Sequence, residues 1–106
     1  MTNKQIETRI ARVREMESHL DRSEAAIRAL DEALTGYENI LDEYHRLEDY
    51  YGGHEWRTDF EADEEGLLPD DLKRGVLSED AVYDLLTEHK KLLIRMSHLV
   101  HEFQNA

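Results

Sequence analysis

Four side chains in the middle of the sequence are of types that recognise ligands: Trp56, Asp59, Lys73 and Arg74. An indole ring beside two cations can bind a carboxylate or an acidic peptide, because the cations attract the carboxylate and the ring supplies apolar contact. We therefore treat these four residues as a candidate patch for a ligand or a protein partner.

The two cations also have a structural interpretation. Lys73 and Arg74 stand in an acidic stretch, and they could neutralise Glu48 and Asp49. These two carboxylates are placed unfavourably, near the negative C-terminal end of a predicted helix. In that case the cations stabilise the fold and recognise nothing.

An acidic run after Phe60 has part of the pattern of a calcium loop. Glu61, Asp63 and Glu65 alternate, and Gly66 follows them. In an EF-hand loop, however, the first ligand is Asp and the last is a bidentate Glu, which here would fall at Leu72. These three carboxylates are weak metal candidates, and we predict no cofactor. A divalent-cation or small-ligand site in this acidic segment remains the alternative function.

Histidine and nucleophile patterns are weaker still. His98 and His101 share one helical face, but the Glu-x-x-His pairs of di-iron bundles do not occur. His89 falls in an apolar seam, where a hydrogen-bonded core or interface imidazole is expected. Asp59 beside Trp56 would have a shifted pKa if it were buried, yet no second catalytic group accompanies it. We predict that the protein is not an enzyme.

The composition restricts the class of partner. The chain has 106 residues, a net charge of −12 and no cysteine. Such a negative charge disfavours nucleic acid and anionic membrane surfaces, because both require clustered cations. The lack of cysteine fits a reducing compartment, and neither a signal-peptide core nor a run of ~20 apolar residues is evident. We expect a cytoplasmic protein.

A long apolar seam predicts one helix over residues 3–50. Apolar residues alternating at three and four positions lie on one stripe of a coiled-coil or bundle helix. The glycine pair Gly52 and Gly53 is expected to end this helix. The seam positions are Ile6, Val13, Leu20, Ile27, Leu34 and Leu41, with Met16, Ser23, Leu30, Tyr37, Tyr44 and Tyr51.

A second seam predicts a helix over residues 78–104 that begins with Ser78 as its N-cap. The two helices would form an all-α, antiparallel, coiled-coil-like hairpin, with Tyr50 and Ser78 at the same end. We expect one domain, residues 1–106. The second seam consists of Val82, Leu85, His89, Leu92, Met96, Leu99 and Phe103, widened by Leu86, Leu93 and Val100.

The two helices differ in length, so Ile6 to Leu20 would have no partner within the hairpin. Either two chains associate as a homodimer, or the first helix turns near Asp21 to Ser23 and forms a three-helix bundle. The unshifted heptad phase favours a continuous helix and self-association. Residues 1–23 carry five bases and four acids, whereas residues 24–50 carry two bases and eight acids. An antiparallel second copy would place the more basic segment of one chain against the acidic segment of the other, so these segment charges favour the antiparallel arrangement.

The connector, residues 51–77, is too long to be a simple turn. Glycine and proline positions predict one short helix over 55–64 that ends before Gly66, and another that begins at Pro69 and is closed by Gly75. Between them, apolar side chains recur every few residues. We expect a partly ordered cap over the open end of the hairpin.

The same region carries a family resemblance. The pattern YY..W..D, then LP, then LKRGVLSED over residues 72–80, set between two long helices, resembles a family of small bacterial helical proteins classed as a domain of unknown function. That resemblance implies a bacterial cytoplasmic protein and gives no activity, cofactor or partner. The function predicted is that of a protein–protein interaction or scaffold protein with an unidentified protein partner.

Overall fold

The computed structural model describes residues 1–105, and over this range it contains four α-helices, one short 3-10 helix and no β-strand. The predicted all-α class is confirmed. The chain divides into two compact units, Met1–Leu41 and a second that begins at Asp42. The elements are α1 (Asn3–Asn39), α2 (Leu41–Tyr51), α3 (His54–Glu64), η1 (Gly75–Leu77) and α4 (Ala81–Gln104).

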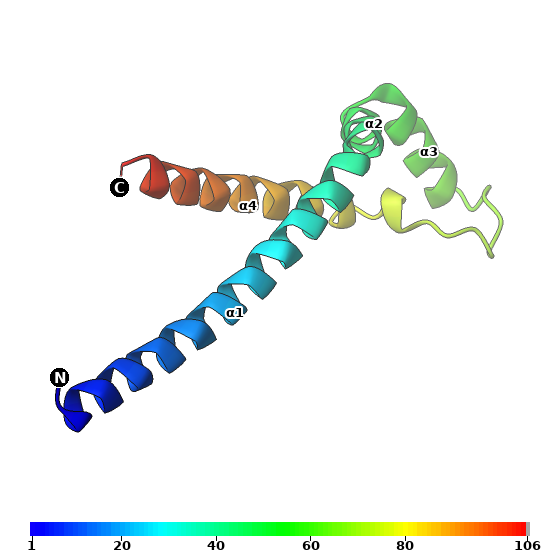
Figure 1. The fold of residues 1–106 in the computed structure, drawn as a ribbon. Coiled ribbons are helices and arrows are strands. Elements are labelled where there is room, and N and C mark those ends of the chain that lie inside the picture. Colours follow the sequence, from blue (N-terminus) through cyan, green and yellow to red (C-terminus); the bar gives the residue numbers. More distant parts are fainter. Residues whose placement is uncertain (106) are drawn as a thin grey trace. The chain divides into compact units, whose positions relative to one another are not determined.

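The first unit consists essentially of α1, which Figure 1 shows as an uninterrupted helix. Asp21 to Ser23 lie in the middle of this helix, so the alternative with a turn at those residues is wrong. The heptad phase runs through this region unshifted, and it contains no glycine or proline that would reverse the chain. The continuity of the apolar stripe was therefore the better guide.

The predicted helix over residues 3–50 is nevertheless wrong at Ile40. The Ile40 N–H donates to the carbonyl of Tyr37 at 3.2 Å, three residues back, and α2 starts at Leu41. The α-helical acceptor would have been the carbonyl of Gly36, a residue whose backbone is weakly restrained because it has no side chain. Side-chain periodicity could not reveal this interruption, because the apolar spacing continues across it.

The second unit is built around the start of α4. Leu77 and Val82 are its most buried side chains, with 5% and 3% of their surface exposed. Two contacts of α2, one with α4 and one with the turn before it, have the antiparallel order of the predicted hairpin. The Tyr44 hydroxyl lies 2.8 Å from His89 Nδ1, and the Tyr51 hydroxyl donates to the Glu79 carbonyl at 3.4 Å.

The first half of the connector folds as predicted. Helix α3 ends at Glu64, and Gly66 closes it with a φ of +73°, a left-handed conformation that favours glycine. The Leu67 N–H donates to the Ala62 carbonyl and the Gly66 N–H to the Asp63 carbonyl, both at 3.0 Å. These two bonds make a Schellman motif, which satisfies carbonyls that the helix end would otherwise leave open.

The helix predicted from Pro69 to Gly75 does not form. The Leu72 N–H donates to the Pro69 carbonyl at 3.2 Å and makes a single turn, and Gly75 begins η1 instead of closing a helix. The physical reason lies in Arg74, whose side chain binds the carbonyls of Pro69 and Leu72. A helix would have used these carbonyls for its own backbone ladder.

Ser78 has the predicted capping chemistry, but α4 begins three residues later than predicted, at Ala81. The Ser78 hydroxyl accepts a hydrogen bond from the Ala81 N–H at 3.2 Å and donates to the Gly75 carbonyl at 2.8 Å. The serine thus links η1 to the first turn of α4. The intervening residues, Glu79 and Asp80, form a turn.

Candidate functional site

Trp56 ties α3 to η1. Its indole N–H donates to the Val76 carbonyl at 2.9 Å. The ring stacks on Phe60 at a centroid distance of 5.1 Å and meets Tyr51 edge-on at 5.3 Å. Because its N–H is hydrogen-bonded and its ring contacts two other aromatic rings, Trp56 is a structural anchor.

Asp59 is also engaged within the second unit. Its carboxylate accepts a hydrogen bond of 2.6 Å from the Tyr50 hydroxyl. This hydrogen bond, together with burial and the negative charges of Asp59 and Glu55, raises the pKa of Tyr50 from 10.0 to about 12. The bond is worth most while the phenol keeps its proton, so the pair joins α2 to α3 at neutral pH.

Arg74 clamps the connector. Its guanidinium forms an ion pair with Asp63 of α3, donates to the Pro69 carbonyl, and reaches the Leu72 carbonyl through Nε at 3.3 Å. The prediction that Arg74 neutralises Glu48 and Asp49 is therefore wrong, because its carboxylate partner comes from α3. One guanidinium with several fixed donors can hold an irregular loop in this way.

The predicted patch is thus distributed over several internal contacts. Trp56, Asp59 and Arg74 each bind another part of the second unit, and Lys73 is exposed. Sequence reasoning did not identify the residues that pair with them. A tyrosine nine residues before Asp59 and an acid eleven residues before Arg74 carry no spacing signal, because in each pair the chain leaves the helix between the two residues.

The weak metal candidates are not gathered into one site. Glu61 and Asp63 lie two residues apart in α3, so their side chains leave opposite sides of the helix. Asp63 is paired with Arg74, and Glu65 is the C-cap residue. Within residues 1–105, no three His, Asp or Glu side chains are grouped as metal ligands would be.

His89 is a hydrogen-bonded interior histidine, as predicted. It is half-buried, and its ring meets the Tyr44 ring edge-on at 4.5 Å in addition to the 2.8 Å contact with the hydroxyl. Tyr44 had been assigned only to the apolar seam. A surface groove beside this pair is lined by Tyr44, His45 and Glu48 of α2 and by Leu86, His89, Lys90 and Leu93 of α4.

The largest uncovered feature of the first unit is the apolar stripe of α1. No residue of this helix is buried. Its large apolar side chains remain 36–67% exposed. We call them the α1 stripe: Ile6, Ile10, Val13, Met16, Leu20, Ile27, Leu30 and Leu34.

The apolar face of α4 is covered only in part. Val82 is buried, and Leu86 and His89 are half-buried. From Leu92 onward every described residue is exposed. No helix among the described residues is long and apolar enough to cross a membrane.

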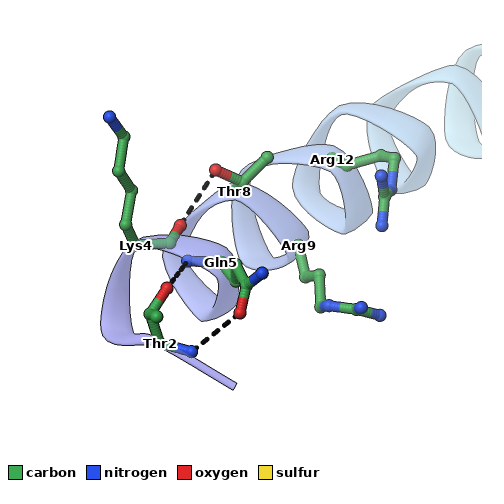
Figure 2. Close-up of a pocket in the computed structure, with 6 residues that line it drawn as sticks. All are labelled: Thr2, Lys4, Gln5, Thr8, Arg9 and Arg12. Carbon is green, nitrogen blue, oxygen red and sulfur yellow. Dashed lines mark hydrogen bonds between the residues drawn. The ribbon is translucent and has the colours of Figure 1, made fainter.

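The N-terminal end of α1 is polar and basic, as Figure 2 shows. The Thr2 hydroxyl accepts from the Gln5 N–H at 3.2 Å, and the Gln5 side chain accepts from the Thr2 N–H at 2.8 Å. This capping box satisfies donors that the helix start would leave free. The side chains of Arg9 and Arg12 extend away from that of Lys4 (Figure 2).

The chain matches the model of a known protein family. The model of a protein family described as "Domain of unknown function (DUF4298)" matches residues 13–99, which include most of α1 and all of α2, α3 and η1. No curated protein matches the chain. No solved structure matches it either.

Proposed function

The chain belongs to the family described as Domain of unknown function (DUF4298), and from that premise we propose that it is a non-enzymatic interaction or scaffold protein that self-associates through α1. The observation that carries the proposal is the α1 stripe. It gathers eight large apolar side chains on a helix of 37 residues with none of them buried.

The α1 stripe is costly to leave in water. Burying a large aliphatic side chain contributes roughly 1.5–3 kcal/mol, and soluble monomers rarely leave a contiguous apolar face exposed. Most of the stability of a helix in a protein comes from packing of its apolar face. Covering the α1 stripe would therefore stabilise both the helix and the complex.

The partner that we propose is a second copy of this chain. Its α1 has the same length and the same heptad spacing, so that side chains of one stripe can fill the spaces between side chains of the other. A dimer with two-fold symmetry also uses the same surface of both chains, so that no free copy of this surface remains to bind a third chain. We therefore propose a homodimer.

The proposal that the protein is not an enzyme is supported by the contacts of the candidate residues within the chain. Trp56, Asp59 and Arg74 already bind other parts of the second unit. We further propose a location in the bacterial cytoplasm. Its support is the absence of cysteine and the resemblance carried by residues 50–80.

Sedimentation at micromolar concentration tests the proposal. The unaltered chain should sediment as a dimer, and the double variant Leu20→Glu, Ile27→Glu should sediment as a monomer. Ser18→Glu with Ala25→Glu is the matched control, since it adds the same charge at the same spacing on the opposite face of α1. A monomeric unaltered chain, or a control that dissociates as readily as the stripe variant, would contradict the proposal.

A further inference from the structure

Resting on the self-association proposed above, we infer that α1 pairs with α1 of a second copy in parallel and in register. The uninterrupted helix over Asn3–Asn39 holds one heptad phase for five repeats. Every residue of α1 therefore has a defined position relative to a partner helix. The charges at the two positions that flank the seam then distinguish the two orientations.

One flank of the seam is acidic. The residues four places after each of four successive seam positions are Glu17, Glu24, Asp31 and Glu38, and all four are exposed. They recur every seven residues, so they form a single row of carboxylates along α1. We call this row the acidic flank.

The other flank carries no acid. The residues immediately before the corresponding seam positions are Arg12, His19, Ala26 and Ala33, and they are exposed as well. We call this row the basic flank. It offers one permanent cation, one titratable imidazole and two small neutral residues.

An antiparallel pair would bring like flanks together. In that orientation the acidic flank of one helix faces the acidic flank of the other along the whole contact, and no cation lies between them. Like charges held across a helix interface oppose association. The basic flanks would face each other and gain no attraction.

A parallel pair brings opposite flanks together. Arg12 then faces Glu17 of the second copy, and His19 faces Glu24 of the second copy. Asp31 and Glu38 face the small side chains of Ala26 and Ala33, without a like charge opposite. Because the pair is symmetric, each favourable contact occurs twice.

Part of the seam matches the preference of parallel dimers. Three of the five first seam positions of α1 hold β-branched residues, Ile6, Val13 and Ile27, and Leu30 stands at a second seam position. The polar Ser23 would meet its own copy only in this register. Arg9 is the one charge at a seam position, and it lies in the second turn, where its side chain extends from the helix (Figure 2).

The charges of the two segments, summed over all their residues, had favoured the antiparallel arrangement, because residues 1–23 are richer in bases than residues 24–50. Three of those bases, Lys4, Arg14 and Arg22, stand at heptad positions on the outer face of α1. They do not face a partner in either orientation. The heptad position of each charge is therefore a better guide to the orientation of the two helices than the summed charge of each segment.

Disulfide trapping of the full chain tests the orientation, since the native sequence has no cysteine. Val13→Cys and Leu30→Cys are prepared separately, one with a mass tag, and mixed under mild oxidation. A parallel pair gives Val13→Cys and Leu30→Cys each linked to its own kind. An antiparallel pair gives the mixed product instead. Ser18→Cys, on the outer face, is the control for random collision.

Each outcome of trapping has a distinct meaning. Predominance of the mixed product overturns the parallel arrangement while leaving the self-association intact. Crosslinking no greater than that of Ser18→Cys, in a chain that sediments as a dimer, overturns α1 pairing in either orientation. A monomer in sedimentation removes the proposed function along with the orientation.

Charge reversal gives a second test that leaves the apolar seam unchanged. Glu17→Arg should weaken dimerisation about tenfold in a parallel pair, because it places arginine opposite Arg12 twice. Adding Arg12→Glu should restore the affinity. In an antiparallel pair Glu17→Arg removes repulsion and strengthens the dimer, so an increase in affinity would contradict the inference.

Discussion

Helix α1 and the connector region of the second unit use their side chains in opposite ways. In the connector, Trp56, Asp59 and Arg74 each have a partner elsewhere in the same unit. In α1 the side chains of Thr8 and His19 contact groups four residues back along the same helix. The connector folds onto its neighbours, whereas the α1 stripe stays exposed.

The difference has a physical origin in side-chain type. The connector combines aromatic rings, the guanidinium of Arg74 and backbone carbonyls that no helix uses, so its polar and aromatic groups find partners within the second unit. The α1 stripe is aliphatic and extends over a helix of roughly 55 Å, and a side chain on a straight helix cannot reach back to its own stripe. Only another elongated surface can cover it.

The largest expected effect comes from removing the connector's anchor. Trp56→Ala should lower the free energy of unfolding by about 2–4 kcal/mol, because it deletes the ring that contacts Phe60 and Tyr51 and the hydrogen bond to Val76. Urea unfolding followed by circular dichroism measures this. The loss should be the same at low and high protein concentration.

Leu30→Ala is the contrasting variant in α1. Its effect should be small in dilute solution and should grow as the protein concentration rises, because the proposed dimer would cover Leu30. If Leu30→Ala were as costly as Trp56→Ala in dilute solution, the contrast between the two regions would fail.

Substitutions of two glycines, one in each region, should change the stability by an intermediate amount. A Cβ at Gly36 of α1 or at Gly66 after α3 would meet no atom within 4 Å. Gly66 has a φ of +73°, which strains any L residue, so Gly66→Ala should destabilise the protein by about 1–2 kcal/mol. Gly36→Ala should instead stabilise α1 by about 1 kcal/mol. Thermal unfolding of both variants measures the two signs, and equal signs would show that backbone conformation does not decide the effect.

The smallest effect is expected at Tyr50. Tyr50→Phe removes the hydrogen bond to Asp59 and should cost about 0.5–1 kcal/mol at neutral pH. The pKa of Tyr50 is raised from 10.0 to about 12 in the folded chain, so folding favours the protonated phenol. The contribution is complete below pH 10 and is lost as the pH rises towards 12.

Two measurements check the Tyr50 prediction. The difference in unfolding free energy between the unaltered chain and Tyr50→Phe should shrink above pH 10. Titration of tyrosinate absorbance should show one late hydroxyl that is missing from the variant. A Tyr50 that titrates with the other tyrosines would contradict the raised pKa.

Local patterns in the sequence predicted much of the fold. The heptad spacing gave a continuous helix through Asp21 to Ser23, and Gly66 marked the end of α3, because both depend on residues within one or two turns. The interruption at Ile40 escaped prediction. It depends on which carbonyl accepts the hydrogen bond from the Ile40 N–H, and the spacing of the side chains does not indicate this.

The candidate site was less predictable because its contacts join residues that are distant along the chain. Residue types singled out Trp56, Asp59 and Arg74 as members of a ligand or partner patch. They could not show that Trp56 bonds Val76 or that Arg74 pairs with Asp63 in place of Glu48 and Asp49. Each of those pairings requires a particular path of the connector between α3 and η1.

The sequence by itself determined the all-α class, the phase of the α1 stripe and the acidic flank beside it, since these follow from residue types at fixed helical spacing. Only the tertiary structure decided which apolar faces are covered. Val82 is buried by the folded connector, whereas the α1 stripe and the end of α4 stay exposed. The physical reason is that periodicity places side chains on a face, but burial depends on what else reaches that face.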